Sequence, residues 1–363
     1  ENGENSLVRS YALDKNKSYN FINEVSSNGE NPCHIQLNKQ KTKIVVSNYT
    51  GGTISIYNVL KNGSLSENIQ VIDHNIITTK SHAHSAQFYK NDLFVADLGR
   101  DFLAHYTHKN DSYNLNNYYL MEEKSGPRHF EINKKGRFIY VLNELNSTIS
   151  VLKKFNETYN NIQNISTLRD DYTAQNSSAD IHLSKNKKFL YVSNRGENSI
   201  AVFKINSKNG ELQKIQNIAV QGDWPRNFTL APNGNFLLVA NQRSKNISVF
   251  KVDKKTFIKD KDNFIISDEV NYTKVVKILS VHNESVMDRV NIFNNDKKNT
   301  INDISTIQSY LKRDTAVVFC QNHLSVSKII QLVQQFPVGI VKRFHLANTK
   351  SIVSSHSKDG RGD

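Results

Sequence analysis

The stretch Leu190-Tyr191-Val192-Ser193-Asn194 has the form that decides the fold, a short apolar run that ends in Asn or Asp. Leu, Tyr and Val fill the run, as is usual for a half-buried strand. The same form recurs at four other places, which are Lys43–Asn48, Leu93–Asp97, Ile139–Asn143 and Leu237–Asn241. The last residues stand at positions 48, 97, 143, 194 and 241. A strand-only repeat of roughly 50 residues predicts the blades of a β-propeller, an all-β fold.

Each unit divides into four short strands. In the fourth unit these are expected at residues 181–183, 189–192, 199–205 and 212–218, separated by turn-rich links such as Ser207-Lys208-Asn209-Gly210. One blade cannot bury both of its faces, whereas stacked blades can, so the array is predicted to be a single domain over residues 1–262.

Two corners of every unit carry polar motifs. The units open with Asn31-Pro32-Cys33-His34, Ser81-His82-Ala83-His84-Ser85, Gly126-Pro127-Arg128-His129-Phe130, Ser177-Ser178-Ala179-Asp180-Ile181-His182 and Trp224-Pro225-Arg226-Asn227-Phe228. Their second strands end in Asn48-Tyr49-Thr50-Gly51-Gly52, Asp97-Leu98-Gly99, Asn143-Glu144-Leu145-Asn146-Ser147, Asn194-Arg195-Gly196 and Asn241-Gln242. Over roughly residues 7–262 this series resembles the seven-bladed propeller lactonases, the 6-phosphogluconolactonase family, which is related to fungal carboxymuconate-cyclising enzymes.

Strand direction predicts where these corners meet. Because neighbouring strands of a blade alternate in direction, the start of the first strand and the end of the second lie on the same face of the disc. First strands line the central channel, so one polar funnel should collect His84, Arg128, His129, Asp180, His182 and Arg226 with Asp97, Asn143, Glu144, Asn194 and Arg195. The alternative is that strand-terminal Asn and Asp only cap turns, and it applies most to Asn48, Asn194 and Asn241.

The residue types in the funnel suit the opening of a lactone. That reaction needs a base that activates water and donors for the developing oxyanion. Glu144 and His84 are the two candidate bases, and Arg128 and Arg226 could hold an anionic group. The resemblance puts weight on the same four residues as catalytic. We assign substrate binding to His129, Asp97, Asn143, Asp180, His182, Asn194 and Arg195.

The function predicted on this basis is hydrolysis of a sugar-acid lactone, with a small anionic lactone as the partner. Two alternatives stay open, a muconate-type cycloisomerase and an inactive propeller scaffold. We expect no cofactor and no metal, since the His residues are dispersed and lack zinc-ligand spacing.

Both ends of the chain depart from the family pattern. There is no Gly-Thr-Tyr opening, and Leu7–Leu13 is expected to be an outer strand. The units amount to five full blades plus a partial one, which indicates either a fragment or a ring closed in another way. Residues 263–363 form a tail outside the repeat, with helical spacing over 300–311 and 325–335 and expected strands over 315–320 and 338–344. This tail is predicted to be a small α/β appendage or unrelated sequence.

Composition narrows the remaining partners. The net charge of +13 could suggest nucleic acid, but Lys and Asn crowd every loop and no basic face is interleaved with aromatic residues, so we expect no nucleic-acid partner. The two cysteines, Cys33 and Cys320, lie far apart and predict no disulfide. No apolar run has transmembrane length, so no membrane partner is expected. We expect a cytoplasmic monomer or weak homodimer, with a periplasmic or secreted location left open.

Overall fold

The structure, a computed structural model, describes residues 6–14, 18–231 and 234–253, together with the backbone of strands at 257–267, 274–277 and 318–320. All regular elements in this part of the chain are strands. The first blade comprises β3 (Pro32–Leu37), β4 (Lys43–Asn48), β5 (Thr53–Val59) and β6 (Leu65–Asp73), and the second β7 (Ala83–Tyr89), β8 (Asp92–Asp97), β9 (Phe102–Lys109) and β10 (Ser112–Leu120). The third comprises β11 (Pro127–Ile132), β12 (Phe138–Asn143), β13 (Thr148–Phe155) and β14 (Thr158–Ser166), and the fourth β15 (Ser177–Leu183), β16 (Phe189–Arg195), β17 (Ser199–Ile205) and β18 (Leu212–Ala219). The fifth comprises β19 (Pro225–Leu230), β20 (Phe236–Asn241), β21 (Asn246–Asp253) and β22 (Phe257–Ser267).

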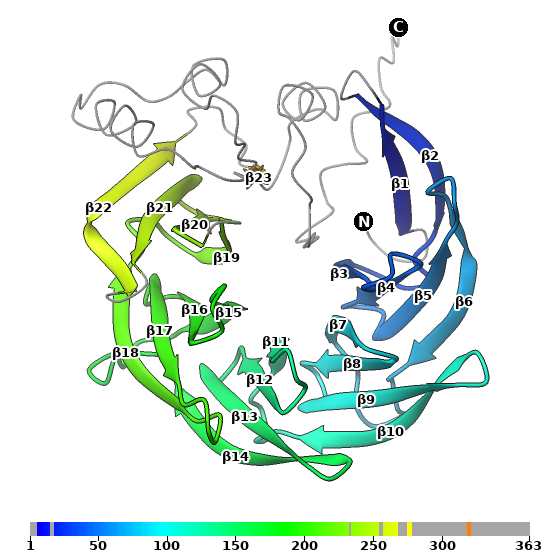
Figure 1. Cartoon of the computed structure of the whole chain (residues 1–363), viewed down its shortest axis with the longest axis horizontal. Coiled ribbons are helices and arrows are strands. Elements are labelled where there is room, and N and C mark those ends of the chain that lie inside the picture. The colour runs from blue at the N-terminus through cyan, green and yellow to red at the C-terminus, as the bar shows by residue number, and fades with distance from the viewer. Residues whose placement is uncertain are drawn as a thin grey trace, which may run out of the picture.

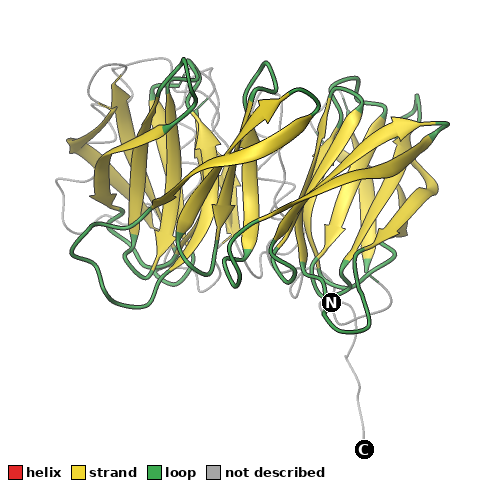
Figure 2. Cartoon of the chain, turned by 90° about the horizontal axis from the view of Figure 1, so that it is seen from below, coloured by secondary structure: helices red, strands yellow, loops and turns green. Residues whose placement is uncertain are grey.

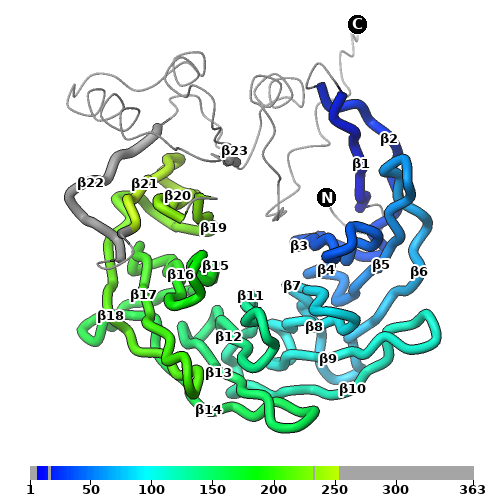
Figure 3. Tube along the Cα trace, in the orientation of Figure 1, coloured from blue at the N-terminus to red at the C-terminus, as the bar shows by residue number. Residues whose placement is uncertain are grey.

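The blades are five antiparallel four-stranded sheets that follow one another around a common centre (Figure 1). The strands of each blade run from the centre outward in chain order, so that β3, β7, β11, β15 and β19 lie innermost (Figure 3). From the side, the strands run between two faces that carry the loops (Figure 2). This arrangement confirms the predicted propeller and its five four-stranded units.

A sixth, two-stranded sheet precedes the first blade. It pairs β1 (Leu7–Leu13) with β2 (Tyr19–Ser26), and β2 lies against β6. This sheet is the partial unit that the sequence predicted in addition to the five full ones.

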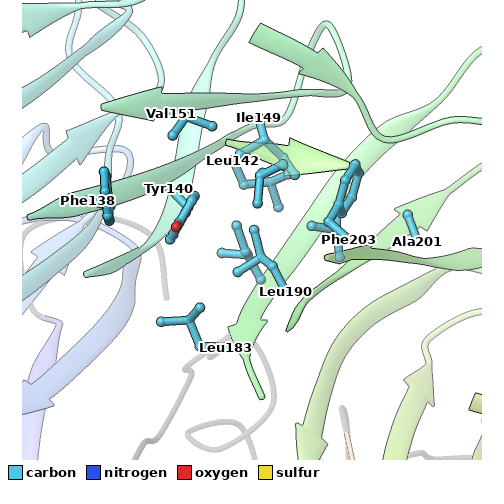
Figure 4. Packing of buried hydrophobic residues seen from close by; sticks show 12 residues of the cluster. Phe138, Tyr140, Leu142, Ile149, Val151, Leu183, Leu190, Ala201 and Phe203 are labelled. Carbon is cyan, nitrogen blue, oxygen red and sulfur yellow. The ribbon is translucent and has the colours of Figure 1, made fainter. Parts of the chain in front are cut away.

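The hydrophobic core lies between neighbouring blades. Between the third and fourth blades, Tyr140 and Leu142 of β12 pack with Leu190 of β16 and Phe203 of β17 (Figure 4). Each of these side chains is at most 1% exposed. Burying a side chain of this size contributes about 1.5–3 kcal/mol, so each blade is stabilised mainly by its neighbours.

The end of the repeat and the tail are described only in part. β22 runs from Phe257 to Ser267, across the boundary predicted at residue 262, and the division into two domains stays a prediction. Part of the strand expected over residues 315–320 is present as β24 (Val318–Cys320), which pairs with β23 (Lys274–Lys277). The predicted helices at 300–311 and 325–335 and the strand at 338–344 lie outside the described residues. In the described part of the chain, no helix has the length and apolarity needed to cross a bilayer.

Candidate functional site

A β-bulge at the start of every inner strand positions the candidate catalytic residues. In the third blade Pro127 pairs with Asn143 and His129 pairs with Leu142, which leaves Arg128 as the extra residue. The same shift in register leaves Cys33, His84 and Arg226 as the extra residues of β3, β7 and β19, and lies between Ser178 and Ile181 in β15. A bulge turns a side chain out of the strand's regular alternation and is common beside active sites. These pairings also confirm that the start of each first strand meets the end of the second strand.

A carboxylate clamped by two guanidinium groups forms the centre of the site. Glu144 Oε2 accepts a hydrogen bond from Arg128 Nη1 at 2.5 Å, and Oε1 lies 2.7 Å from Arg195 Nη2. The Arg128 and Arg195 side chains are 5% and 4% exposed, and that of Glu144 is 15% exposed. Burial raises the pKa of the Glu144 carboxyl, but Arg128 and Arg195 lower it more, to about 2. Glu144 is therefore an anion throughout the physiological pH range.

A third guanidinium makes the site strongly cationic. Burial and then the charges of Arg128 and Arg195 lower the pKa of Arg226 to about 9. Within the described part of the chain, Arg226 Nε is buried without a hydrogen-bond partner. Arg128 and Arg195 contact the carboxylate of Glu144, and the charge of Arg226 acts on all three groups, so an anionic ligand would relieve both the repulsion and the unmet hydrogen-bonding capacity.

His84 supplies a neutral imidazole beside this charge. It is 4% exposed, and burial, then the charge of Arg128, lower its pKa well below 6.5. Its ring meets the edge of Tyr49 at 5.5 Å between centroids, and Tyr49 in turn stacks on His82 at 4.5 Å. The Cys33 Sγ atom lies 4.0 Å from His84 Nδ1. Burial raises the pKa of that thiol to about 12, so Cys33 is a protonated neighbour and not a nucleophile at neutral pH.

A buried polar network lies next to His84, whose ring centroid is 5.1 Å from that of His129. Asp180 Oδ1 lies 2.8 Å from His129 Nδ1, while Asp180 Oδ2 lies 3.0 Å from His182 Nε2 and accepts from Asn227 Nδ2 at 2.7 Å. Burial lowers the pKa of His129 to about 4 although Asp180 opposes the shift. The pKa of His182 is about 9, because Asp180 and Glu131 outweigh its burial. Asp180 thereby joins β11, β15 and β19.

The structure does not bring three of the predicted ligands into the cluster of Arg128, Arg195, Arg226 and Glu144. The side chains of Asp97, Asn143 and Asn194 are at most 1% exposed, and they bond to their own corners or to the link from the preceding blade. Asp97 accepts from Ser81 Oγ at 2.6 Å and from the backbone N–H of His82 at 3.0 Å, and its Oδ2 lies 2.9 Å from His74 Nδ1. Asn143 donates to the hydroxyls of two residues of β13, and Asn194 Nδ2 donates to the Thr167 carbonyl oxygen at 3.0 Å. These residues close the loops, which is the turn-capping alternative for strand-terminal Asn and Asp.

Four residues of the site were not among the predicted ligands, namely Tyr49, His82, Cys33 and Trp224. Two of them occupy a repeat position at which another unit carries a predicted residue. Cys33 corresponds to Arg128 in the bulge, and Tyr49 corresponds to Glu144 after the strand-terminal Asn. Aligning the five units position by position would have identified these two, whereas His82 and Trp224 align with Asn31 and Gly126, which are not predicted ligands.

Comparisons with known proteins match the propeller part of the chain. The family described as "Lactonase, 7-bladed beta-propeller" matches residues 1–262. A 6-phosphogluconolactonase from Bacillus subtilis is 32% identical over 236 residues, which cover 62% of this chain and 67% of that protein. A 6-phosphogluconolactonase from Formosa agariphila is 35% identical over 251 residues, which cover 62% of this chain and 68% of that protein. The chain thus spans about two thirds of the length of these relatives.

A solved structure agrees with the sequence matches. The periplasmic gluconolactonase of Pseudomonas aeruginosa superimposes with a TM-score of 0.64 at 26% identity, covering 70% of this chain and 76% of that one.

Proposed function

We propose that this chain, which belongs to the family of seven-bladed β-propeller lactonases, hydrolyses a sugar-acid lactone that carries an anionic group, as 6-phosphogluconolactone does. The observation that carries the substrate class is the excess of positive charge at Glu144, whose carboxylate is contacted by Arg128 and Arg195 and lies within electrostatic range of Arg226. Arg128 and Arg226 are the ligands for the phosphate or carboxylate of the substrate, because a guanidinium binds such groups through two parallel hydrogen bonds.

Of the two candidate bases, His84 fits the role better. Its imidazole is neutral at pH 7 and can accept a proton from water as the water oxygen attacks the lactone carbonyl carbon. The tetrahedral intermediate then collapses, the bond from the carbonyl carbon to the ring oxygen breaks, and the imidazolium returns the proton to that oxygen. A neighbouring guanidinium stabilises the oxyanion. The product is the open hydroxy acid.

Glu144 has a different part in this scheme. A carboxylate with a pKa of about 2 is a weak base, and both of its oxygens are held by guanidinium groups. We assign it the positioning of Arg128 and Arg195. Anion binding would also offset the positive charges that lower the pKa of His84, so the bound substrate would make its own base stronger.

The test is acid release from 6-phosphogluconolactone at constant pH, compared with the uncharged gluconolactone. Arg128→Ala should lower kcat/KM for the phosphorylated lactone by about 30- to 1000-fold, the loss of roughly 2–4 kcal/mol of charged hydrogen bonding. The control is Arg137→Ala, which removes an exposed guanidinium from the same blade and should change kcat/KM less than twofold. A folded wild-type protein that hydrolyses neither lactone would refute the proposal, and equal loss on both lactones would refute the role of Arg128 in anion binding.

We extend the proposal to the cellular location and the oligomeric state of the protein. A phosphorylated sugar lactone crosses a bilayer poorly because its charge is costly to bury, so a cytoplasmic enzyme would meet this substrate where it is made. We propose activity as a monomer or weak homodimer, and the scheme needs no nucleic-acid or membrane partner.

A further inference from the structure

A strained residue lies at the edge of the site. The residue before the proline that opens an inner strand has positive φ in three blades, with φ of 52° at Asn31, 66° at Gly126 and 67° at Trp224. Asn and Gly tolerate this left-handed conformation, whereas a bulky side chain adopts it only under constraint. Such outliers persist where the surroundings determine them, and they gather at functional sites. Trp224 is also the single Trp of the chain.

The backbone of Trp224 is fixed on both sides. Its N–H donates to Asn198 Oδ1 at 2.9 Å, and its carbonyl oxygen accepts from the Gln242 N–H at 2.9 Å. These bonds hold the chain in place for any side chain at this position. They explain the turn, but they do not explain why an indole ring occupies it.

The ring of Trp224 lies against the clamp on Glu144. The guanidinium carbon of Arg195 lies over the indole at 5.5 Å from the ring centroid, and that of the exposed Arg243 lies at 3.4 Å. Arg195 uses the edge of its guanidinium for Glu144 and for the carbonyl oxygens of Ser177 and Ser178. Hydrogen bonds lie in the guanidinium plane, so the face of the group is left for an aromatic ring.

We propose that Trp224 is a positioning residue of the lactone site, whose indole ring holds Arg195 in the geometry that binds Glu144. The strained backbone is retained because Asn or Gly in its place would leave the face of the Arg195 guanidinium uncovered. The order of contacts is Trp224 to Arg195, Arg195 to Glu144, and Glu144 to Arg128, the anion-binding residue. The kinetic part of this inference rests on the proposed lactonase activity.

Two substitutions at residue 224, one of which introduces the residue type found at the same position of another blade, distinguish the positioning of Arg195 from a general packing role of Trp224. Trp224→Asn places there the residue type of Asn31, so the variant should melt at or above the temperature of the wild type while kcat/KM falls roughly tenfold. Trp224→Phe keeps an aromatic face and should stay within about threefold of the wild type. Unchanged kcat/KM in Trp224→Asn would overturn the proposal, as would an equal loss in both variants.

A double-mutant cycle tests whether the effect passes through Arg195. If it does, adding Trp224→Asn to Arg195→Lys should cost little beyond Arg195→Lys alone. Independent effects that multiply would show that Trp224 acts in another way.

Fluorescence provides a test that needs neither a substitution at residue 224 nor lactonase activity. The emission of the single Trp should change when Glu144→Gln loosens Arg195, and it should stay the same in Glu157→Gln, which lies on a distant exposed hairpin. Unchanged emission in Glu144→Gln would overturn the positioning role even if the protein is an active lactonase. A change in emission without any lactone hydrolysis would support positioning and refute the proposed function alone.

Discussion

Glu144→Gln should destabilise the protein at neutral pH and have little effect in strong acid. The substitution keeps the shape of the side chain and removes the charge that binds Arg128 and Arg195. In the folded protein the pKa of Glu144 is about 2, against a reference value of 4.5. That difference corresponds to about 3 kcal/mol of unfolding free energy, and the side chain, 15% exposed, is too buried for solvent to screen much of it.

The sign of the pH dependence follows from the lowered pKa. A carboxylate with a lowered pKa in the folded state contributes its full stability above the unfolded pKa, here 4.5, and loses it as pH falls toward 2. The difference between wild type and Glu144→Gln should therefore be about 3 kcal/mol at pH 7, shrink below pH 4.5 and nearly vanish near pH 2.

Urea denaturation at several pH values measures this difference directly, because contributions of the other titrating groups cancel between the two proteins. The matched control is Glu157→Gln, which breaks a 3.3 Å pair with Lys154 on a side chain that is 92% exposed. It should change the unfolding free energy by less than about 1 kcal/mol at any pH. Equal stability of Glu144→Gln and wild type at pH 7, or a difference that does not depend on pH, would show that Arg128 and Arg195 do not stabilise the ionised form of Glu144.

Two further predictions concern the base and the corner residues. In the wild type, kcat/KM should be flat near pH 7 and fall in acid as the imidazole of His84, whose pKa is well below 6.5, becomes protonated. His84→Gln should abolish this fall in acid, whereas Glu144→Gln should keep it. A fall in acid that survives in His84→Gln would point to another base. Asp97→Asn removes the charge that faces the buried His74 and replaces two buried acceptors with one acceptor and one donor among His74, Ser81 and a backbone N–H. It should therefore lower the unfolding free energy by about 1–3 kcal/mol but reduce kcat/KM of the folded protein less than tenfold. Urea denaturation and steady-state kinetics measure the two effects, and a large kinetic loss without destabilisation would return Asp97 to the substrate site.

The blades were predictable because their signal is repeated. A single apolar run such as Leu190–Val192 could belong to a strand or to a buried helix, but five runs at one spacing leave little choice. The expected strands over 199–205 and 212–218 match β17 and β18 almost residue for residue. The meeting of the two corners was predictable too, since it follows from antiparallel pairing alone.

The pairing inside the site was not predictable from the sequence. Arg195 binds Glu144 of the preceding blade, and that contact depends on the rotation between blades, which no local pattern encodes. The bulges at His84, Arg128 and Arg226 are likewise invisible, since one extra residue at the start of a strand changes neither composition nor spacing. The sequence could therefore name the charged residues around Glu144, but neither their pairing nor the neighbouring Tyr49, His82, Cys33 and Trp224.

In this repeat, a residue that stabilises the turn is followed directly by a residue of the candidate site. The strand-terminal residue, Asn143 in the third blade, turns into its own corner and bonds to the hydroxyls of the next strand. The next residue, Glu144, lies just beyond the end of β12 and instead pairs with Arg128 and Arg195. The same step leads from Asn194 to Arg195 and from Asn48 to Tyr49. The conspicuous Asn and Asp residues that reveal the repeat are thus its structural part, and the variable residue that follows each of them is where one scaffold can acquire a carboxylate, a guanidinium or an aromatic ring.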